Sequence, residues 1–345
     1  MPQHFASDNN AGMCPEAFAA LTQANQAGHA GGYGDDPWTV RAIAAIGDLF
    51  EHEAKVFFAG NGTAANALVL AHLLAPFDAV IAHAHSHIEE DEANAVGFYG
   101  GGAKIVTLAS PHAKLTPDLV REAAGRGRGV HSTRARALSL TQSTELGTVY
   151  APGEIGALCE TAHGLGLKVH MDGARFANAV ASLGCAPAEI SWKAGVDVLV
   201  FGGVKNGLGF GEAIVFFDAG LADAFAWRVK QSGHLTSKMR FVTAPWTGLL
   251  DGGVWLKNAA HANAMAKRLA AGLTSLGLPL LETVEANAVF VDMPVAVQER
   301  VRGKGWRFYT FSGLTGCRLM CAWDTQAATV DRFLADVAAC IDRAP

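Results

Sequence analysis

Four polar segments of this chain contain residue types that could carry out chemistry, and each directly follows a short apolar run. The segments are Gly60–Asn66, His83–His87, His170–Arg175 and Phe201–Gly209. Short apolar runs are typical of buried strands, and ligands of open α/β sheets bind outside the carboxyl ends of the strands. We therefore expect the four segments to meet at one edge of a sheet and to form one site.

The first segment opens a predicted helix with the turn Gly60-Asn61-Gly62-Thr63. Backbone N–H groups at a helix N-terminus, together with the Thr63 hydroxyl, would bind a phosphate, although an ordinary glycine turn has the same pattern. The segment also fits a loose dinucleotide fingerprint, which requires an acid at the end of the following strand. Asp78 precedes that strand and His83 ends it, so the dinucleotide interpretation is weakened.

The second segment contains three alternating histidines, His83, His85 and His87. Such spacing occurs among zinc ligands, and His170 with Asp172 could complete the metal site of a hydrolase. Alternatively, one histidine stacks on a flat aromatic cofactor while the others are incidental, or the loop is simply solvated. This segment by itself leaves the three interpretations open.

The two later segments place an acid and a lysine after strands. Asp172 follows Lys168–Met171, where a buried carboxylate could pair with a protonated pyridine nitrogen or could simply cap the next helix. Lys205 lies in a glycine-rich loop after Val196–Phe201, and glycine neighbours would leave room for a planar cofactor. A desolvated lysine can act as a nucleophile toward an aldehyde, and the loop does not match a P-loop.

The four segments together supply a phosphate-binding turn, a ring-stacking histidine, a strand-end aspartate and a loop lysine, in that order. Pyridoxal phosphate (PLP) chemistry needs all of these roles at once. The sequence therefore predicts a PLP enzyme that holds its cofactor as a Schiff base on Lys205. This interpretation assigns no metal site.

The elements that position these residues alternate between apolar runs and helix-length segments. Uniformly apolar strands are covered by helices on both faces, and helical crossovers between them make a mostly parallel sheet. The predicted strands are Lys55–Ala59, Ala79–Ala82, Ile105–Leu108, Ala137–Thr141, Lys168–Met171, Val196–Phe201 and Glu212–Phe217, with a helix from the Gly60 turn to about Leu74. The predicted fold class is α/β, with a mostly parallel central sheet and helices on both faces.

The pattern changes after Pro245. Long helices are expected at Gly252–Leu276 and Thr325–Ile341, with strands between them at Ala288–Asp292, Gly305–Phe311 and Gly316–Ala322. We expect residues 1–250 to form a large domain with an N-terminal arm, and residues 251–345 to form a smaller C-terminal α+β domain.

The composition argues against several classes of protein. The formal net charge is −5 and basic residues are not interleaved with aromatic ones, so nucleic acid is not an expected partner. The apolar stretch Ala64–Phe77 is too short to span a membrane, and Met1–Asn10 lacks the features of a signal peptide. The six cysteines form no CxxC pair. We expect a cytoplasmic enzyme.

The chain resembles the low-specificity L-threonine aldolases, which belong to the fold-type I PLP enzymes related to the β-eliminating lyases. The matching stretches run nearly end to end, and the block His170–Arg175 and the Lys205 loop are the most specific of them. The other stretches are Ser7-Asp8-Asn9, Tyr33–Pro37, Gly60–Asn66, Ser86-His87-Ile88 and Gly316–Leu319. The resemblance implies the PLP-dependent transferase-like fold and a homo-oligomer, usually a tetramer.

The resemblance also implies which residues hold the cofactor. Lys205 would carry the Schiff base, Asp172 would face the pyridine nitrogen and His87 would lie over the ring. Gly62 and Thr63 would hold the phosphate.

The substrate carboxylate would be bound by Ser7, Arg175 and Arg318, because the planar fork of arginine suits a carboxylate. Arg175 would also contact the cofactor. Many relatives have Asn-Thr-His where this chain has Ser143-Thr144-Glu145. That difference leaves Glu145 and His87 as candidates for the group that deprotonates the substrate hydroxyl.

The implied reaction is the retro-aldol cleavage of L-threonine, L-allo-threonine or a related β-hydroxy-α-amino acid, such as phenylserine, to glycine and an aldehyde. A PLP-dependent β-eliminating lyase or aminotransferase would use the same Lys205 and Asp172. A zinc-dependent hydrolase would instead use His83, His85 and His87.

Overall fold

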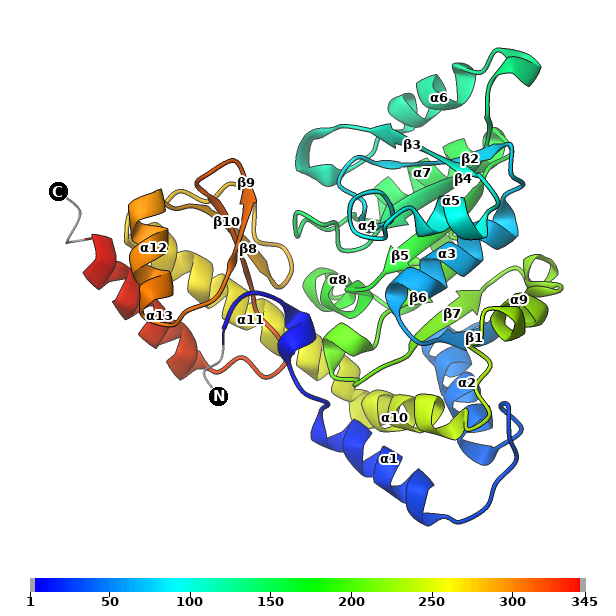
Figure 1. Ribbon diagram of the computed structural model, residues 1–345, viewed down its shortest axis with the longest axis horizontal. Coiled ribbons are helices and arrows are strands. Elements are labelled where there is room, and N and C mark those ends of the chain that lie inside the picture. Colours follow the sequence, from blue (N-terminus) through cyan, green and yellow to red (C-terminus); the bar gives the residue numbers. More distant parts are fainter. Residues whose placement is uncertain (1–3, 342–345) are drawn as a thin grey trace.

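The computed structural model describes residues 4–341, and its larger sheet has seven strands (Figure 1). In the sheet these strands lie in the order β1-β7-β6-β5-β4-β2-β3. The strands are β1 Lys55–Ala59, β2 Asp78–His83, β3 Lys104–Leu108, β4 Arg134–Thr141, β5 Lys168–Gly173, β6 Val198–Phe201 and β7 Glu212–Phe216. The strands from β6 to β3 are parallel, whereas β7 is antiparallel to β6 and β1. The predicted mostly parallel sheet is confirmed.

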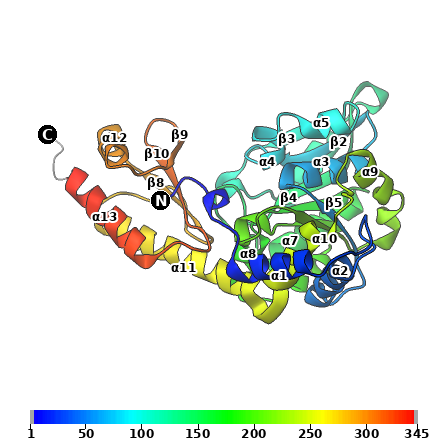
Figure 2. The same ribbon diagram turned by 60° about the horizontal axis from the view of Figure 1, so that its bottom comes forward.

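Alternate residues of β6 pack into different layers. Val198 and Val200 join a cluster with residues of α3 and α9, whereas Leu199 and Phe201 join a cluster with residues of α2, α7, α8 and α10. Successive side chains of a strand point to opposite faces, so a strand that is covered on both faces must be apolar throughout. Figure 2 shows helices on both sides of this sheet.

The helices around the large sheet begin and end as follows. They are α1 Pro15–Gln26, α2 Pro37–Phe50, α3 Gly62–Leu73, α4 His87–Glu90, α5 Ala95–Tyr99, α6 Pro117–Gly125, α7 Pro152–Gly164, α8 Phe176–Leu183, α9 Phe225–Gln231 and α10 Arg240–Leu250. Helix α3 is apolar on nearly all sides, and its residues from Ala65 to Ala71 are buried. An evenly apolar helix belongs in an interior, which explains why α3 is buried along most of its length.

The smaller sheet has three antiparallel strands, β8 Ala288–Asp292, β9 Tyr309–Ser312 and β10 Gly316–Met320, in the order β8-β10-β9. It packs with α11 Val254–Ser275, α12 Val295–Gly303 and α13 Ala327–Ile341 around its own apolar cluster. The predicted strand Gly305–Phe311 is shifted in the structure: Gly305 has a φ of +96° and forms a turn, so β9 starts only at Tyr309. The domain boundary near residue 250 stays a prediction.

The N-terminal arm connects the two sheets and lies between them in Figure 1. The amide of Phe5 donates to Arg307 O and its carbonyl accepts from Met320 N, while its ring packs against Trp306 and Phe333. The next turn, the 3-10 helix η1 (Asp8–Asn10), instead contacts Arg175 beside the large sheet. The arm therefore carries residues from the small sheet to the edge of the large one.

None of the helices in the described part of the chain combines the length and the apolar character that crossing a bilayer requires.

Candidate active site

Of the residues predicted from the sequence to bind the cofactor, all except Arg175 line one cavity of about 310 Å³. It is lined by Gly62, Thr63, His87, Asp172 and Lys205, among others. They come from the start of α3, the start of α4, the end of β5 and the loop after β6. The structure thus brings the four polar segments to the carboxyl edge of the parallel strands, where α/β sheets bind ligands.

At one end of the cavity, α3 begins with amide groups that can bind an anion. Asn61 caps the helix, and its Oδ1 accepts a hydrogen bond of 2.9 Å from Ala64 N. The amides of Gly62 and Thr63 precede the first intrahelical bonds, so they are free to donate to a ligand. A Cβ built on Gly62 would meet nothing within 4 Å, which shows that the space in front of this turn is open.

Asp172 is buried and ionised beside the cavity. Its Oδ2 accepts from Asn66 Nδ2 at 2.9 Å and its Oδ1 accepts from Ala174 N at 3.0 Å. Burial would raise the pKa of Asp172, but His87, Lys205 and the Ala174 amide outweigh it and lower the pKa. The helix after β5 has Arg175, not Asp172, at its N-cap position. Asp172 is therefore a fixed negative charge and not a cap of α8.

Lys205 lies in the one-turn helix η6 (Val204–Asn206), directly after β6. Glu212 holds this turn, because its Oε2 accepts from the amides of Gly203 at 2.6 Å and Val204 at 3.3 Å. Burial raises the pKa of Glu212 to about 7. No hydrogen bond or ion pair within residues 4–341 occupies the Lys205 amine, so it is available to a ligand.

The glycines before Lys205 serve packing more than cofactor space. A Cβ on Gly202 would lie 2.6 Å from Ala174 O, and one on Gly203 would lie 2.5 Å from Leu208 Cδ1. The loop therefore passes so close to its neighbours that side chains cannot fit at these positions.

The three alternating histidines have three different environments. His83 bonds through its ring to the backbone of Ser110, at 3.1 and 3.2 Å. His85 pairs with Glu90 at 3.0 Å, and His87 pairs with Glu92 at 2.8 Å. Among the described residues, no three His, Cys, Asp or Glu side chains are placed to hold a metal ion. The zinc hydrolase interpretation therefore has no support in the geometry, and His87 is the histidine that lines the cavity.

The two arginines predicted to bind the substrate interact with each other, do not line this cavity and have different partners. Arg175 is buried and donates from Nε and Nη2 to the two carboxylate oxygens of Asp8, at 2.8 and 3.0 Å. Its remaining Nη1 lies 3.8 Å from Glu145 Oε2. Arg318 has a buried Nε without a hydrogen-bond partner among the described residues, and its guanidinium lies 5.5 Å from the Tyr309 ring centroid.

Ser7 accepts a hydrogen bond of 3.2 Å from the amide of Asn9, at the N-cap of η1. Asn9 itself lines the cavity. The arm thus brings Ser7 to the border of the site, although Ser7 is not among the residues that line the cavity.

Sequence reasoning missed four polar residues that shape the site: Asp8, Asn66, Glu92 and Glu212. Asp8 and Asn66 lie inside matching stretches without a role of their own. Glu212 could have been noticed, because an acid at the start of the apolar run Glu212–Phe217 is unusual. Glu92 ends the run Glu89-Glu90-Asp91-Glu92, in which nothing local separates it from its exposed neighbours.

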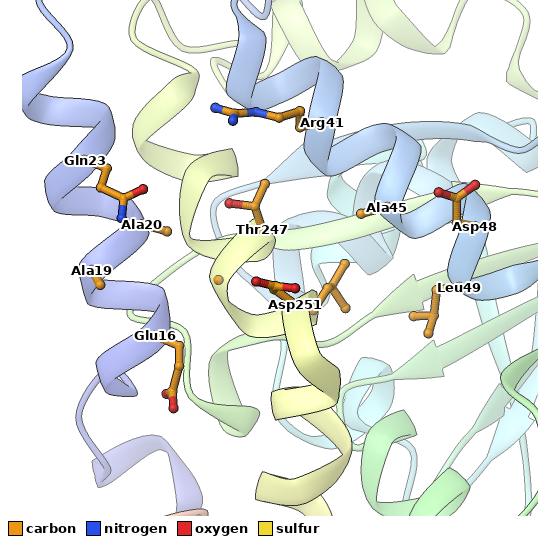
Figure 3. A pocket seen from close by; sticks show the side chains of 12 residues that line it. Glu16, Ala19, Ala20, Gln23, Arg41, Ala45, Asp48, Leu49, Thr247 and Asp251 are labelled. Carbon is orange, nitrogen blue, oxygen red and sulfur yellow. The ribbon is translucent and has the colours of Figure 1, made fainter.

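A larger cavity of about 620 Å³ lies between α1, α2 and α10, and Figure 3 shows Gln23, Arg41 and Asp251 around it. Its lining residues include neither a lysine nor a histidine. It therefore has no group that could attach an aldehyde cofactor.

The smaller cavity fits PLP in each of its parts. The free amine of Lys205 can bind the aldehyde carbon, the buried carboxylate of Asp172 can face the pyridine nitrogen, and the α3 amides can bind the phosphate. These groups are fixed by hydrogen bonds to Glu212, Asn66 and Asn61.

Comparison with known proteins identifies the family. The model of the family described as beta-eliminating lyase matches residues 4–296. A low-specificity L-threonine aldolase of a Pseudomonas species is 51% identical, over 98% of this chain and 97% of the relative. The chain belongs to the threonine aldolase group of the β-eliminating lyase family.

Solved structures of threonine aldolases and of other enzymes share the fold. The structure of a threonine aldolase from Leishmania major matches with a TM-score of 0.92 and 28% identity, over 97% of this chain and 98% of that chain. A serine palmitoyltransferase from Sphingomonas wittichii matches with a TM-score of 0.73 at 18% identity, covering 97% and 86% of the two chains. The second likeness concerns the fold alone, which is the PLP-dependent fold type I predicted for this threonine aldolase family member.

Proposed function

We propose that this protein cleaves L-threonine and related β-hydroxy-α-amino acids, such as L-allo-threonine and phenylserine, by a PLP-dependent retro-aldol reaction to glycine and an aldehyde. The observation that carries the proposal is the cavity in which Lys205, Asp172, His87 and the start of α3 meet. The family membership and the 51% identity to a low-specificity L-threonine aldolase support the same reaction.

Four groups would hold the cofactor. The amides of Gly62 and Thr63 with the Thr63 hydroxyl bind the phosphate, and Asp172 keeps the facing nitrogen protonated. The Lys205 amine would be the group that attaches the aldehyde carbon of the cofactor. When bound, PLP accepts the electron pair that is released as a bond to Cα breaks.

Arg318 is the first candidate to bind the substrate carboxylate. Burial and the neighbouring Arg175 both lower the pKa of Arg318, because a second positive charge is unfavourable there. An anionic ligand would relieve this repulsion and would satisfy the buried Nε. Arg175 contributes its charge and the Nη1 that Asp8 leaves free, and Ser7 borders the same space.

The bond changes need one proton acceptor. His87 takes the proton of the β-hydroxyl, the Cα–Cβ bond breaks, and the aldehyde leaves. A proton is then added to Cα, which gives glycine. Glu145 is the second candidate for the acceptor, and its carboxylate lies near Arg175 at the border of the site. His87 is preferred because it lines the cavity together with Lys205.

The visible absorption spectrum tests the proposal. We expect a yellow protein whose band borohydride bleaches, and the release of acetaldehyde and glycine from L-threonine. Lys205→Ala should abolish covalent attachment of PLP, and turnover retained in that variant would contradict the scheme. Ammonia with a keto acid, or transfer of the amino group, would instead identify a β-eliminating lyase or an aminotransferase.

We also propose a cytoplasmic homo-oligomer, most simply a homotetramer, with a role in amino acid metabolism. Large apolar side chains that are exposed in the single chain, including Phe98, Trp227 and Leu314, support association. Light scattering of the purified protein tests it, and a monomer at micromolar concentration would contradict it.

A further inference from the structure

Glu92 is an acid that the structure buries among exposed acids. It follows Glu89, Glu90 and Asp91, which are exposed, yet its own side chain is 0% exposed. A buried carboxylate is unfavourable unless other groups bind it, so its position calls for a specific partner.

The partners of Glu92 form a continuous chain through the site. Its Oε1 accepts from His87 Nδ1 at 2.8 Å and from Asn66 Nδ2 at 2.9 Å. The same Asn66 nitrogen donates its second hydrogen to Asp172 Oδ2 at 2.9 Å. Glu92 and Asn66 thus connect His87 with Asp172, which both line the cavity. Glu92 itself does not line the cavity.

The bond to Glu92 decides which atom of His87 can react. Burial raises the pKa of Glu92, and the hydrogen bonds from His87 and Asn66 oppose that rise. In its ionised form the carboxylate accepts but does not donate, so Nδ1 of His87 carries its hydrogen and Nε2 is left as the acceptor. Within residues 4–341, the side chain of Glu92 forms hydrogen bonds with His87 and Asn66 through Oε1, while its buried Oε2 has no hydrogen-bond partner. This is the arrangement in which a carboxylate orients an imidazole for proton transfer.

We propose that Glu92 is a positioning residue for the cleavage reaction: it fixes the His87 ring and its tautomer so that Nε2 takes the proton of the substrate β-hydroxyl. This inference rests on the proposed role of His87 as the proton acceptor.

The charges around His87 predict the direction of its titration. The hydrogen bond to Glu92 is the largest cause that raises the pKa of His87, and it outweighs burial; Asp172 and Glu145 raise the pKa further. Lys205 and Arg175 are cations that interact electrostatically with Asp172. His87 must be unprotonated to accept a proton, so removing the charge of Glu92 should move the acid limb of the pH–rate profile to lower pH.

A matched control pair lies on the same segment. His85 Nδ1 lies 3.0 Å from Glu90 Oε1, and the same two atoms of His87 and Glu92 lie 2.8 Å apart. The side chains of His85 and Glu90, however, are 44% and 42% exposed. Glu90→Gln therefore makes the same chemical change without touching the cavity.

The test compares two reactions of the PLP-loaded enzyme, one of which needs the β-hydroxyl. Threonine cleavage requires removal of that proton, whereas exchange of the glycine α-hydrogen with solvent deuterium uses the same cofactor and carboxylate site without it. In Glu92→Gln we expect kcat for cleavage to fall about 100-fold, KM to change less than about threefold and glycine exchange to stay within about threefold. Glu90→Gln should match the wild-type enzyme in both reactions.

A second measurement does not depend on turnover. The carbon signal of histidine Cε1 reports imidazole titration, and His87→Asn assigns the signal of His87. The His87 titration should shift to lower pH in Glu92→Gln and stay unchanged in Glu90→Gln. Should Glu92→Gln prove insoluble, Glu92→Asp keeps the charge on a shorter side chain, and the ratio of cleavage to exchange should fall about tenfold.

Two outcomes overturn the inference and one overturns its basis. Equal losses of cleavage and glycine exchange in Glu92→Gln would show a purely structural role. An unchanged titration of His87 would show that Glu92 does not act through it. If His87→Asn cleaved threonine at the wild-type rate, the proposed role of His87 itself would fail, whatever Glu92 does.

Discussion

The two arginines at the border of the site, Arg175 and Arg318, differ in what their guanidinium groups bind. Arg175 forms a two-pronged ion pair with Asp8, whose Oδ2 also accepts from Asn287 Nδ2 at 3.0 Å. Burial would lower the pKa of Arg175, but Asp8 and Glu145 raise it instead. The buried Nε of Arg318 has no protein partner within residues 4–341, and the pKa of Arg318 is lowered.

From this difference we infer that Arg175 is mainly a structural residue and Arg318 mainly a ligand-binding one, although the sequence suggests the same role for both. The Arg175 fork ties the N-terminal arm to the helix that follows β5. Arg318 lies on β10 of the small sheet, where burial and Arg175 lower its pKa more than the nearby carboxylates raise it. An anionic ligand would offset this remaining cost. We therefore expect Arg175 to dominate stability and Arg318 to dominate substrate affinity.

Asp8→Ala should have the largest effect. It leaves the buried Arg175 guanidinium without its hydrogen-bonded counter-charge, with the more distant Glu145 and Asp172 as the remaining acids that act on it. This should lower the free energy of unfolding by about 3–5 kcal/mol in urea denaturation. The control is Asp331→Ala, because Asp331 receives the same two-pronged contact from Arg268 on the surface, at 2.8 Å for each bond. That variant should lose less than about 1 kcal/mol. Equal losses in the two variants would contradict a special role of the buried pair.

Arg318→Leu should affect binding more than stability. Loss of the charge-assisted hydrogen bonds to the substrate carboxylate should raise KM for L-threonine by about 10- to 100-fold. The melting temperature should stay the same or rise, because a buried unpaired donor is removed. Arg318→Lys keeps the charge and loses the planar fork, so its KM should lie between those of the wild-type enzyme and Arg318→Leu. A large loss of stability with an unchanged KM would reverse the assignment of the two arginines.

The pH dependence of stability gives the smallest effect. Burial would raise the pKa of Asp8, but Arg175 and Lys205 outweigh it and lower the pKa from 3.8 to about 2. A depressed carboxyl pKa stabilises the fold above the unfolded value, so about 2 kcal/mol should be lost as the pH falls from about 4 to about 2. Asp8→Asn cannot titrate, so the difference in stability between it and the wild type should shrink over this range. A constant difference would show that Asp8 is not ionised in the folded protein.

The fold was predictable from the sequence where the burial of a single strand or helix dictates which residues it contains. Strand β6 is covered on both faces, so its residues Val198–Phe201 are apolar without interruption and can be recognised locally. The helix that begins at Gly62 was likewise predicted from its turn. The small sheet was predicted less well, because β9 is exposed and Gly305 turns the chain before it.

The site was predictable for residues that directly follow buried strands, because position alone brings them to the carboxyl edge of the sheet. Asp172 and Lys205 are of this kind, and they line the same cavity. Glu92 was not predictable, since its burial depends on how the turn between α4 and α5 folds against α3.

The sequence by itself determined the α/β layering, the order of the polar segments and the lysine that could attach an aldehyde cofactor. These depend on local hydrophobic patterns and on the chemistry of single residues. The tertiary structure decided which charges pair. Asp8 and Arg175 are 167 positions apart, and Glu92 and Asn66 are 26 apart. A local pattern does not encode these pairings, because the strength of a charge pair depends on burial, and burial is set by segments that meet only in the folded chain.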